Sequence, residues 1–248
     1  MLAIIGGTGL TQLSNLAVSR RQVVRTPYGE PSGALTFGQI GGREVLFLPR
    51  HGYGHTVPPH MVNYRANMWA LHSQGVEQIV SVASVGGIRA DLSPGAIAVP
   101  DQIIDYTWGR RSTFHEGEER AVVHIDFTRP YCDRLRNRLI SAAAAAGEAV
   151  VDGGVYATTQ GPRLETAAEI DRLERDGADM VGMTGMPEAA LARELDLCYA
   201  AIAVVANHAA GRGQSRDAVR MEDINATLQT ALSRVRGIIE RLVEDRGG

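Results

Sequence analysis

The stretch LAIIGGTG, residues 2–9, places a short apolar run directly before a glycine-rich turn. A continuous apolar run of this length is typical of a strand covered on both faces, as in a parallel or mixed sheet wrapped by helices. The glycine-rich turn can expose backbone N–H groups to an anion, and the Thr8 hydroxyl adds a donor. The stretch therefore predicts an α/β fold with an anion site after its first strand, while a plain tight turn stays open as the alternative.

The glycine-rich turn does not match two familiar nucleotide motifs. The dinucleotide fingerprint G-x-G-x-x-G fails, because Gln12 occupies the position of its third glycine. All 25 Lys and Arg residues of the chain are arginine, so the lysine that a triphosphate P-loop requires is missing. The same absence excludes a Schiff base with pyridoxal phosphate. Neither a P-loop nucleotide site nor a pyridoxal phosphate site is expected.

Length and composition indicate one α/β domain that spans residues 1–248. The net charge of −3 gives no electrostatic footprint for nucleic acid. The longest clear apolar run, residues 198–206, is too short to span a membrane. With only two cysteines, Cys132 and Cys198, we expect no disulfide framework and a reducing cytoplasm as the compartment.

Apolar patterning divides the chain into predicted strands and helices. The strands are expected at residues 2–5, 34–39, 45–48, 78–83, 96–99, 103–105, 155–159 and 199–206. The helices are expected at residues 63–74, 165–176, 187–195 and 221–244, with a further helix through Leu135, Leu139, Ala142 and Ala146 that ends at Gly147.

Polar or glycine-rich residues follow several of these strands at once. In such sheets, ligands bind beyond the carboxyl ends of the strands. The sequence therefore predicts one ligand pocket at this edge of the sheet. The residues concerned are Thr8 after strand 2–5, Arg50 and His51 after strand 45–48, Ser84 after strand 78–83, and Asn207 after strand 199–206.

Arg50 and His51 both suit an anion. Arginine presents a fixed fork of donors to phosphate oxygens, and the adjacent imidazole can supply another donor. A surface arginine beside a hydrogen-bonded histidine is the alternative. His51, His55 and His60 lie close together, but their segment contains Gly and Pro, forms no predicted helix and carries no carboxylate. No metal site is therefore expected there.

Two further segments place polar residues beside predicted helices. In QGPRLETAAE, Glu165 is expected in the first turn of a helix, where a carboxylate usually compensates the helix dipole. In GMTGMPEAALARE, Thr184 precedes a helix whose first turn suits Pro187 and Glu188. Both segments gain functional meaning only if they face the same pocket as the phosphate donors.

Taken together, long collinear stretches resemble the purine nucleoside phosphorylase family, specifically its methylthioadenosine phosphorylase branch. The resemblance covers nearly the whole chain. It implies a phosphorylase-type mixed central β-sheet flanked by helices, a homotrimer or dimer of trimers in the cytoplasm, inorganic phosphate as co-substrate, and neither a metal nor an organic cofactor. The stretches are IIGGTGL, TPYGEPS, RHGYGHTVPPHMVNYRANMWAL, SVGGIRADLSPGAIAVPDQIIDYT, HIDFTRPYC, TQGPRLETAAE and MTGMPEAALARE.

The resemblance also implies roles for individual residues. Phosphate is expected to contact Thr8, Arg50, His51, Ala83, Ser84 and Thr184. The nucleoside is expected to contact Met183 under the ribose, Leu164 against the purine face, His55 near the ribose and phosphate, and His124 at the 5′ end across a subunit boundary. Apart from the resemblance, Val219 and Met221 are apolar candidates for the 5′ end because they lie near the start of the last predicted helix.

The predicted base site departs from the adenine-specific branch. That branch ends the strand with two aspartates separated by one residue, where this chain has Asn207 and Ala209, and it has a small hydroxyl residue where this chain has Glu165. Glu165 and Asn207 match the pair that 6-oxopurine enzymes use. A carboxylate can accept from the N1–H of hypoxanthine, and an amide can donate to N7 or O6.

The sequence-based hypothesis is therefore a pentosyltransferase that cleaves a 5′-methylthio 6-oxopurine nucleoside with phosphate, with Asn207, Glu165 and His51 as catalytic residues. Methylthioadenosine phosphorylase and a general 6-oxopurine nucleoside phosphorylase remain alternatives. A nucleoside-binding sensor without catalysis is the alternative from another class, and a Rossmann oxidoreductase is disfavoured by the incomplete glycine fingerprint.

Overall fold

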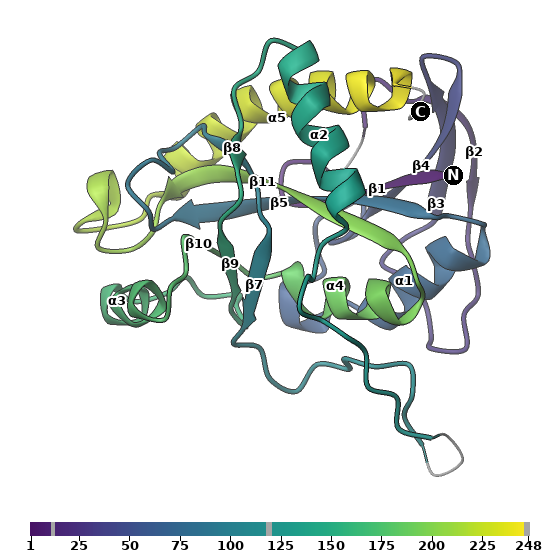
Figure 1. Cartoon of the computed structure of the whole chain (residues 1–248), viewed down its shortest axis with the longest axis horizontal. Coiled ribbons are helices and arrows are strands. Elements are labelled where there is room, and N and C mark those ends of the chain that lie inside the picture. Colours follow the sequence, from purple (N-terminus) through teal and green to yellow (C-terminus); the bar gives the residue numbers. More distant parts are fainter. Residues whose placement is uncertain (11–12, 118–120, 246–248) are drawn as a thin grey trace.

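A mixed 11-stranded sheet forms the centre of the molecule, with helices on both of its faces (Figure 1). The computed structural model describes residues 1–10, 13–117 and 121–245. The strands are β1 (Leu2–Gly6), β2 (Ala17–Gln22), β3 (Leu35–Ile40), β4 (Arg43–Pro49), β5 (Gln78–Gly87), β6 (Ile97–Val99), β7 (Gln102–Asp105), β8 (Val151–Asp152), β9 (Val155–Thr158), β10 (Met180–Gly182) and β11 (Cys198–His208). The helices are α1 (Tyr64–Ser73), α2 (Asp133–Ala145), α3 (Ala167–Arg175), α4 (Gly185–Glu194) and α5 (Met221–Glu244), with short 3₁₀ turns at Pro59–Met61 and Gly213–Ser215.

Four parallel strands lie side by side at the core of this sheet. β1 pairs in parallel with β4 and with β5, and β5 pairs in parallel with β11. Their carboxyl ends therefore open onto the same edge, as the sequence analysis expected. The last residues of β5, Gly86 and Gly87, also pair antiparallel with β10, and β10 in turn runs parallel to β9. The segments that follow β9 and β10 are thereby brought next to the same edge.

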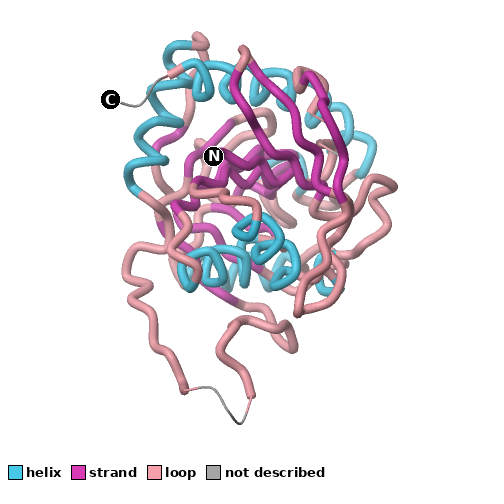
Figure 2. Tube along the Cα trace, turned by 90° about the vertical axis from the view of Figure 1, so that its right-hand side faces the viewer, coloured by secondary structure: helices cyan, strands magenta, loops and turns pink. Residues whose placement is uncertain are grey.

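The core strands are apolar at consecutive positions because both faces of the sheet are covered. On β1, Ile4 packs into a buried cluster that includes α2 and α5, whereas Ala3 and Ile5 pack into a second cluster that includes α1 and α4. Figure 2 shows the strands enclosed between helices on both sides. No helix among the described residues is long and apolar enough to cross a membrane.

The predicted elements are confirmed, with differences at their ends. β5 runs on to Gly87 and β11 to His208, so Ser84 and Asn207 lie inside strands rather than after them. Three strands were not predicted: β2, β8 and β10. β2 is an edge strand whose residues are largely exposed, so it lacks the alternation of apolar and polar residues that marks a half-buried strand. β8 and β10 have only two and three residues.

Glu165 is not in the first turn of a helix, contrary to the prediction. α3 begins at Ala167 with Thr166 as its N-cap. The Thr166 hydroxyl accepts from the Glu169 amide at 3.1 Å, and the Glu169 carboxylate accepts from the Thr166 amide at 2.8 Å. This capping box makes Glu169 the carboxylate that compensates the helix terminus. Glu165 precedes the helix and is free to serve the pocket.

The two cysteines form a disulfide, which the sequence analysis did not expect. Cys132 and Cys198 have Cα atoms 5.2 Å apart and close a loop with a sequence separation of 66. Cys132 is the N-cap of α2, and its amide donates to the Tyr199 carbonyl at 2.8 Å. The cross-link therefore joins the start of α2 to the start of β11.

A long segment between β7 and α2, residues 106–132, projects from the body of the molecule (Figures 1 and 2). We call it the arm. Outside residues 118–120 it is described, and it carries exposed apolar side chains at Trp108, Val122 and Val123. His124 is exposed beside them. The arm thus presents apolar surface away from the core.

Candidate active site

A cavity of about 470 Å³ lies at the edge where the core strands end. Its walls come from the ends of β1, β4, β5 and β11, the loops before α3 and α4, and the start of α5. Every predicted site residue except His124 lines this cavity. They are Thr8, Arg50, His51, His55, Ala83, Ser84, Leu164, Glu165, Met183, Thr184, Asn207, Ala209 and Val219.

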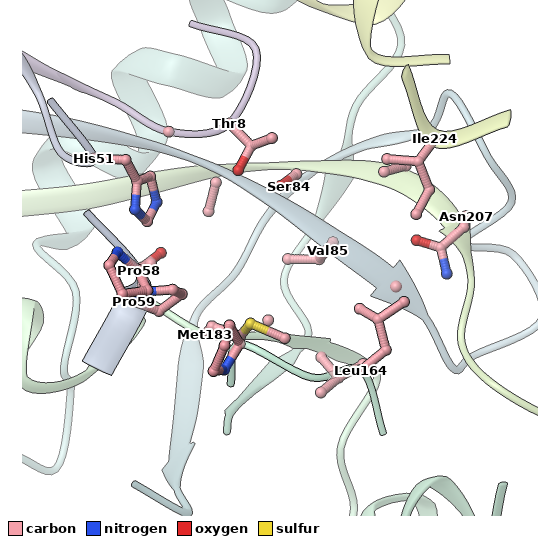
Figure 3. Close-up of a pocket in the computed structure, with 18 of the residues that line it drawn as sticks. Thr8, His51, Pro58, Pro59, Ser84, Val85, Leu164, Met183, Asn207 and Ile224 are labelled. Carbon is pink, nitrogen blue, oxygen red and sulfur yellow. The ribbon is translucent and has the colours of Figure 1, made fainter. Parts of the chain in front are cut away.

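The cavity has two chemically different ends. Figure 3 shows Asn207, Leu164 and Ile224 at one end, and His51 with Pro58 and Pro59 at the other. Thr8 and Ser84 lie along the wall between them, and Val85 and Met183 line the middle (Figure 3). A ligand that fills the cavity can therefore meet hydroxyl donors along one wall and an amide at one end.

Gly7 packs tightly against β5 and the Arg50 side chain in the cavity wall. A Cβ atom at Gly7 would lie 2.5 Å from the Val82 carbonyl oxygen and 3.0 Å from Nη1 of Arg50. Only glycine fits such a close approach. The glycine-rich turn thus packs directly over the Arg50 guanidinium, and both residues line the cavity.

Arg50 is fully buried, and most of its donors are already engaged. Nε and Nη2 donate to the two carboxylate oxygens of Glu188 at 2.8 and 3.0 Å. Nη2 also donates to the Ser81 hydroxyl at 2.6 Å, and Nη1 donates to the Val82 carbonyl at 3.1 Å. Four of the five guanidinium hydrogens are thereby used. Arg50 cannot present its whole fork to phosphate, as the sequence analysis expected, and has one N–H left for a ligand.

The ion pair keeps both groups charged. Burial works against charge on the Glu188 carboxyl, but the Arg50 guanidinium and donors from Ser81 and Tyr199 hold its pKa below the usual range. The pKa of Arg50 is raised by the Glu188 carboxylate in spite of burial. The sequence pattern around Glu188 indicates only a carboxylate in the first turn of a helix. Ser81 and Arg50 lie 107 and 138 positions away from Glu188 in the chain, so no local pattern reveals this role.

His51 is neutral and has a defined tautomer. Burial and the nearby Arg50 charge lower the pKa of His51 to about 4. Its Nδ1 lies 2.8 Å from the Val57 carbonyl oxygen, which can only accept, so Nδ1 carries the proton. Nε2 is then an acceptor, not the additional donor that the sequence analysis expected. The His55 ring lies next to it, with ring centroids 4.9 Å apart.

Glu165 is half-buried at the entrance to α3 and is hydrogen-bonded to Thr159. The Thr159 hydroxyl donates to its carboxylate at 2.6 Å. Burial raises the pKa of Glu165, and the bond from Thr159 offsets part of that increase. The second carboxylate oxygen has no hydrogen bond to another described side chain, and Glu165 lines the cavity.

Asn207 reaches the cavity because β11 changes register just before it. Val205 pairs with Val85 and Asn207 with Gly86, so Ala206 is an extra residue. Such a bulge redirects the side chains that follow it. Nδ2 of Asn207 donates to the His208 carbonyl at 2.6 Å, which orients the amide. One N–H and the carbonyl oxygen of the amide remain available to a ligand.

His124 does not line this cavity and lies exposed on the arm. Several lining residues were not predicted. They include Val57, Pro58 and Pro59 from the turn after Arg50–His51, and Ile224 one turn into α5. The two prolines in HTVPPH could have indicated a rigid segment of the cavity wall. Ile224 could not have been found in this way, because in the sequence it belongs to the apolar stripe by which its helix packs on the core. Met221, which was expected at the 5′ end, also lines the cavity.

Among the described residues, no group of three or more His, Cys, Asp or Glu side chains is arranged to bind a metal ion. His51 and His55 are close, but the lining residues that follow them are threonine, valine and proline, and the charged Arg50 beside His51 disfavours a cation. The donor set of the cavity therefore suits an anion and a polar organic ring better than a cation.

Comparison with known proteins shows the family to which the chain belongs. The phosphorylase superfamily model matches residues 1–244. A protein of Pseudomonas syringae pv. tomato, named probable S-methyl-5′-thioinosine phosphorylase, is 54% identical over 241 residues, which cover 97% of each chain. The 6-oxopurine nucleoside phosphorylase of Pyrococcus furiosus is 48% identical over 215 residues, 85% of this chain and 80% of that protein.

The fold is also similar to that of a solved enzyme. The structure of methylthioadenosine phosphorylase from Schistosoma mansoni in complex with adenine superposes with a TM-score of 0.93 and 34% sequence identity. The match covers 98% of this chain and 90% of that one. Because the family model and these relatives span nearly its whole length, the chain belongs to the phosphorylase superfamily.

Proposed function

We propose that the protein catalyses the phosphorolysis of a 5′-methylthio 6-oxopurine nucleoside, as a pentosyltransferase of purine salvage. A phosphate oxygen attacks the anomeric carbon, the bond from that carbon to purine N9 breaks, and the purine leaves with the electron pair and takes up a proton. The products are hypoxanthine and 5-methylthioribose 1-phosphate. The observation that carries the proposal is the presence of Glu165 and Asn207 in one cavity with hydroxyl and arginine donors.

The base end of the cavity supports a 6-oxopurine. The ionised Glu165 carboxylate accepts from the N1–H of hypoxanthine, and the free N–H of Asn207 donates to N7 or O6. Adenine has an unprotonated N1, which would face the carboxylate acceptor to acceptor. A site whose polar groups are left unpaired by a ligand discriminates strongly against it. Leu164 gives this ring aliphatic packing, and Ala209 leaves room where an aspartate would stand.

The phosphate end combines neutral donors with one charged group. Thr8, Ser84 and Thr184 supply hydroxyls, the backbone around Ala83 supplies its polar groups, and Arg50 supplies its remaining N–H. Monohydrogen phosphate also carries one O–H. This group can donate a hydrogen bond to Nε2 of His51, because the neutral ring leaves that nitrogen unprotonated. The bound dianion stabilises positive charge that develops on the sugar, and Asn207 stabilises negative charge on the leaving purine.

The start of α5 supports a 5′-methylthio substituent. Val219 and Met221 are apolar residues that line the cavity at this place. A methylthio group gains by leaving water there, whereas a 5′-hydroxyl would lose hydrogen bonds without replacement. Met183 under the ribose and His55 beside it complete the sugar site. The names of relatives that are about half identical to this chain support the same substrate class.

The assembly belongs to the proposal as well. The exposed apolar residues of the arm, Trp108, Val122 and Val123, favour docking on a second copy of the chain. In a homotrimer, or a dimer of trimers, the arm brings His124 to the 5′ end of the neighbouring cavity. Light scattering of the purified protein tests the assembly, and His124→Ala is expected to raise KM for the nucleoside. We place the enzyme in the cytoplasm, which cell fractionation tests.

Inorganic phosphate is the only co-substrate in this proposal, and the reaction needs neither a metal nor an organic cofactor. All the roles above are filled by side chains and backbone groups of the chain. Activity is therefore expected to survive extended dialysis against EDTA. Loss of activity in EDTA and recovery with a single divalent metal would contradict this part of the proposal.

The test of the reaction is phosphate-dependent release of base from three nucleosides. The purified full chain is expected to prefer methylthioinosine to methylthioadenosine and to inosine, with no release when phosphate is omitted. A clear preference for methylthioadenosine overturns the assignment of Glu165 and Asn207. A preference for inosine overturns the apolar 5′ end. Tight nucleoside binding without release of base points to a sensor instead of an enzyme.

A further inference from the structure

Arg110, at the start of the arm, makes an unusual set of contacts. Its Nη1 donates to the carbonyl oxygens of Met183 and Met186 at 2.8 and 2.6 Å and to the Tyr64 hydroxyl oxygen at 3.2 Å. Its Nη2 donates to the carbonyl oxygens of Thr159 and Gln160 at 3.2 and 2.9 Å. Nε donates to the side-chain carbonyl of Gln160 at 3.2 Å. All five donors of one guanidinium thus bind uncharged acceptors.

Apart from the Tyr64 hydroxyl, which lies on α1, these acceptors belong to two segments that carry the candidate site. The first loop, residues 159–165, follows β9 and ends at Glu165. The second loop, residues 183–186, follows β10, carries Met183 and Thr184, and includes the first two residues of α4, where Met186 has a non-helical backbone. β9 and β10 are parallel neighbours, so the two loops leave the sheet side by side. Beyond the paired residues, one backbone bond continues the ladder, from the Thr159 amide to the Gly182 carbonyl at 2.8 Å.

Arg110 spans the gap where this ladder ends. Its planar guanidinium presents donors in a fixed fork, so one edge binds one loop and the neighbouring edge binds the other. The carbonyl oxygens involved are close to the cavity, and buried carbonyls without a donor are costly. Among the described residues, no carboxylate pairs with Arg110. An ion pair is therefore not what holds its side chain in this place.

We propose that Arg110 is a positioning residue, which sets the spacing between the base-reading loop of Glu165 and the sugar and phosphate loop of Met183 and Thr184. The inference rests on the proposed function for what those loops bind. Arg110 touches no substrate in this arrangement. It acts through six main-chain and side-chain oxygens, and it connects both loops to the arm on which it lies.

Lysine cannot replace Arg110 in this role. Its ammonium group is a single point with three donors and cannot reach acceptors on both loops at once. A small displacement of a substrate-positioning group costs on the order of 100-fold in rate. We therefore expect Arg110→Lys and Arg110→Ala each to lower kcat by about 100-fold, although the arm keeps its other contacts, such as those of Thr113 and Phe114 with Glu194, in both variants.

Arg111 provides a matched control. It is the next residue on the same segment, its side chain is exposed, and within the described part of the chain it pairs with Glu116 at 3.2 Å. Arg111→Ala is expected to keep kcat and both KM values within about twofold of the wild-type enzyme. The comparison removes effects that come simply from loss of an arginine in this segment.

The experiment combines kinetics with hydrogen exchange on the full chain. In Arg110→Ala, exchange is expected to increase in residues 159–165 and 182–186 while the amides of β1, β5 and β11 keep their protection. Added guanidinium ion at millimolar concentration is expected to restore part of the kcat of Arg110→Ala and none of that of Arg110→Lys. A purely structural residue would instead weaken protection throughout the sheet and would show no rescue.

The inference is overturned if Arg110→Ala keeps wild-type kinetics, or if its loss of protection spreads through the whole sheet. Failure of the proposed function looks different. In that case the wild-type protein releases no base from any of the three nucleosides, whereas the exchange pattern of the two loops still decides whether Arg110 holds them.

Discussion

Arg50 and Glu188 form a two-bond ion pair in the wall of the cavity, closed to solvent, with Nε–Oε2 and Nη2–Oε1 distances of 2.8 and 3.0 Å. Ser81 and Tyr199 donate to the same carboxylate at 2.7 and 2.8 Å. The guanidinium therefore cannot turn toward a ligand, and its charge is already paired. Under the proposed function, phosphate therefore meets one fixed N–H and a positive charge that Glu188 partly neutralises, which favours a specific orientation of phosphate over tight binding.

Glu188→Gln is predicted to destabilise the fold and to increase its dependence on phosphate. The substitution removes the charge that compensates Arg50, and breaking a buried ion pair costs about 3–5 kcal/mol. Phosphate then becomes the nearest compensating charge, so added phosphate should raise the melting temperature of the variant more than that of the wild type. Urea unfolding and thermal melts with and without phosphate measure both effects.

The exposed pair Arg241–Glu244 serves as the control for this prediction. Glu244→Gln is expected to change the free energy of unfolding by less than about 1 kcal/mol and to leave the response to phosphate unchanged. Equal phosphate shifts in the wild type and Glu188→Gln would mean that Arg50 is not in contact with phosphate.

Asn207→Asp is predicted to lower kcat/KM for methylthioinosine by about 100-fold, because an ionised carboxylate cannot donate to N7 or O6 and the loss of one such donor has this size. Activity on methylthioadenosine is expected to fall less or to rise. Measuring both nucleosides on the same preparation separates a change in base recognition from a general loss. Retention of wild-type turnover of methylthioinosine would show that Asn207 does not contact the base.

The pH dependence of the reaction is predicted to report the ionisation of Glu165. Binding of the N1–H requires the carboxylate form, so kcat/KM should fall on the acid side as the carboxyl is protonated. Burial raises the pKa of Glu165, and this acid limb therefore lies above the usual range of glutamate. Thr159→Val removes a hydrogen bond to the ionised form, which raises the pKa further and moves the limb to higher pH.

Thr158 offers a matched control for this substitution. It is the preceding residue, it is fully buried, and within the described residues its hydroxyl has no hydrogen-bond partner. Thr158→Val is expected to leave the acid limb where it is. Coincident pH profiles for Thr159→Val and Thr158→Val would contradict the assignment of the limb to Glu165.

The stability of the fold is predicted to fall at mildly acidic pH because of His51. Its pKa is about 4 in the folded protein and 6.5 in the unfolded chain, so the unfolded chain binds the proton first as the pH drops. The contribution of neutral His51 to the free energy of unfolding is therefore complete above pH 6.5 and is lost as the pH falls toward 4. Between pH 7 and 5 the loss amounts to about 2 kcal/mol. Urea unfolding at both pH values should show a smaller loss in His51→Gln, and equal losses would contradict the prediction.

Local patterns predicted the fold well where one physical cause dominates. The runs that became β1, β5 and β11 are apolar at every position because helices cover both faces, and glycine or polar residues mark where they approach the cavity. The capping box of Thr166 and Glu169 could also have been predicted, since a threonine followed three residues later by glutamate is typical of a helix N-terminus. Applying it would have placed Glu165 outside α3.

Contacts between distant residues could not be predicted in this way. Glu188 looks like an ordinary first-turn carboxylate, and only the fold brings Arg50 and Ser81 to it. Arg110 and Arg111 are indistinguishable in the sequence, yet one binds two site loops and the other is exposed. The pairing of Cys132 with Cys198 likewise depends on where α2 begins relative to β11.

Reduction of the disulfide is predicted to lower stability without abolishing activity. The bond closes a loop with a sequence separation of 66, for which the loss of unfolded-state entropy is worth up to about 4 kcal/mol. Neither cysteine lines the main cavity, so the site geometry does not depend directly on the bond. Urea unfolding with and without dithiothreitol measures the change, and the double variant Cys132→Ala with Cys198→Ala should be insensitive to the reductant. An unfolding curve of the wild type that does not respond to dithiothreitol would show that the bond is absent in solution, because the closed loop would then contribute nothing.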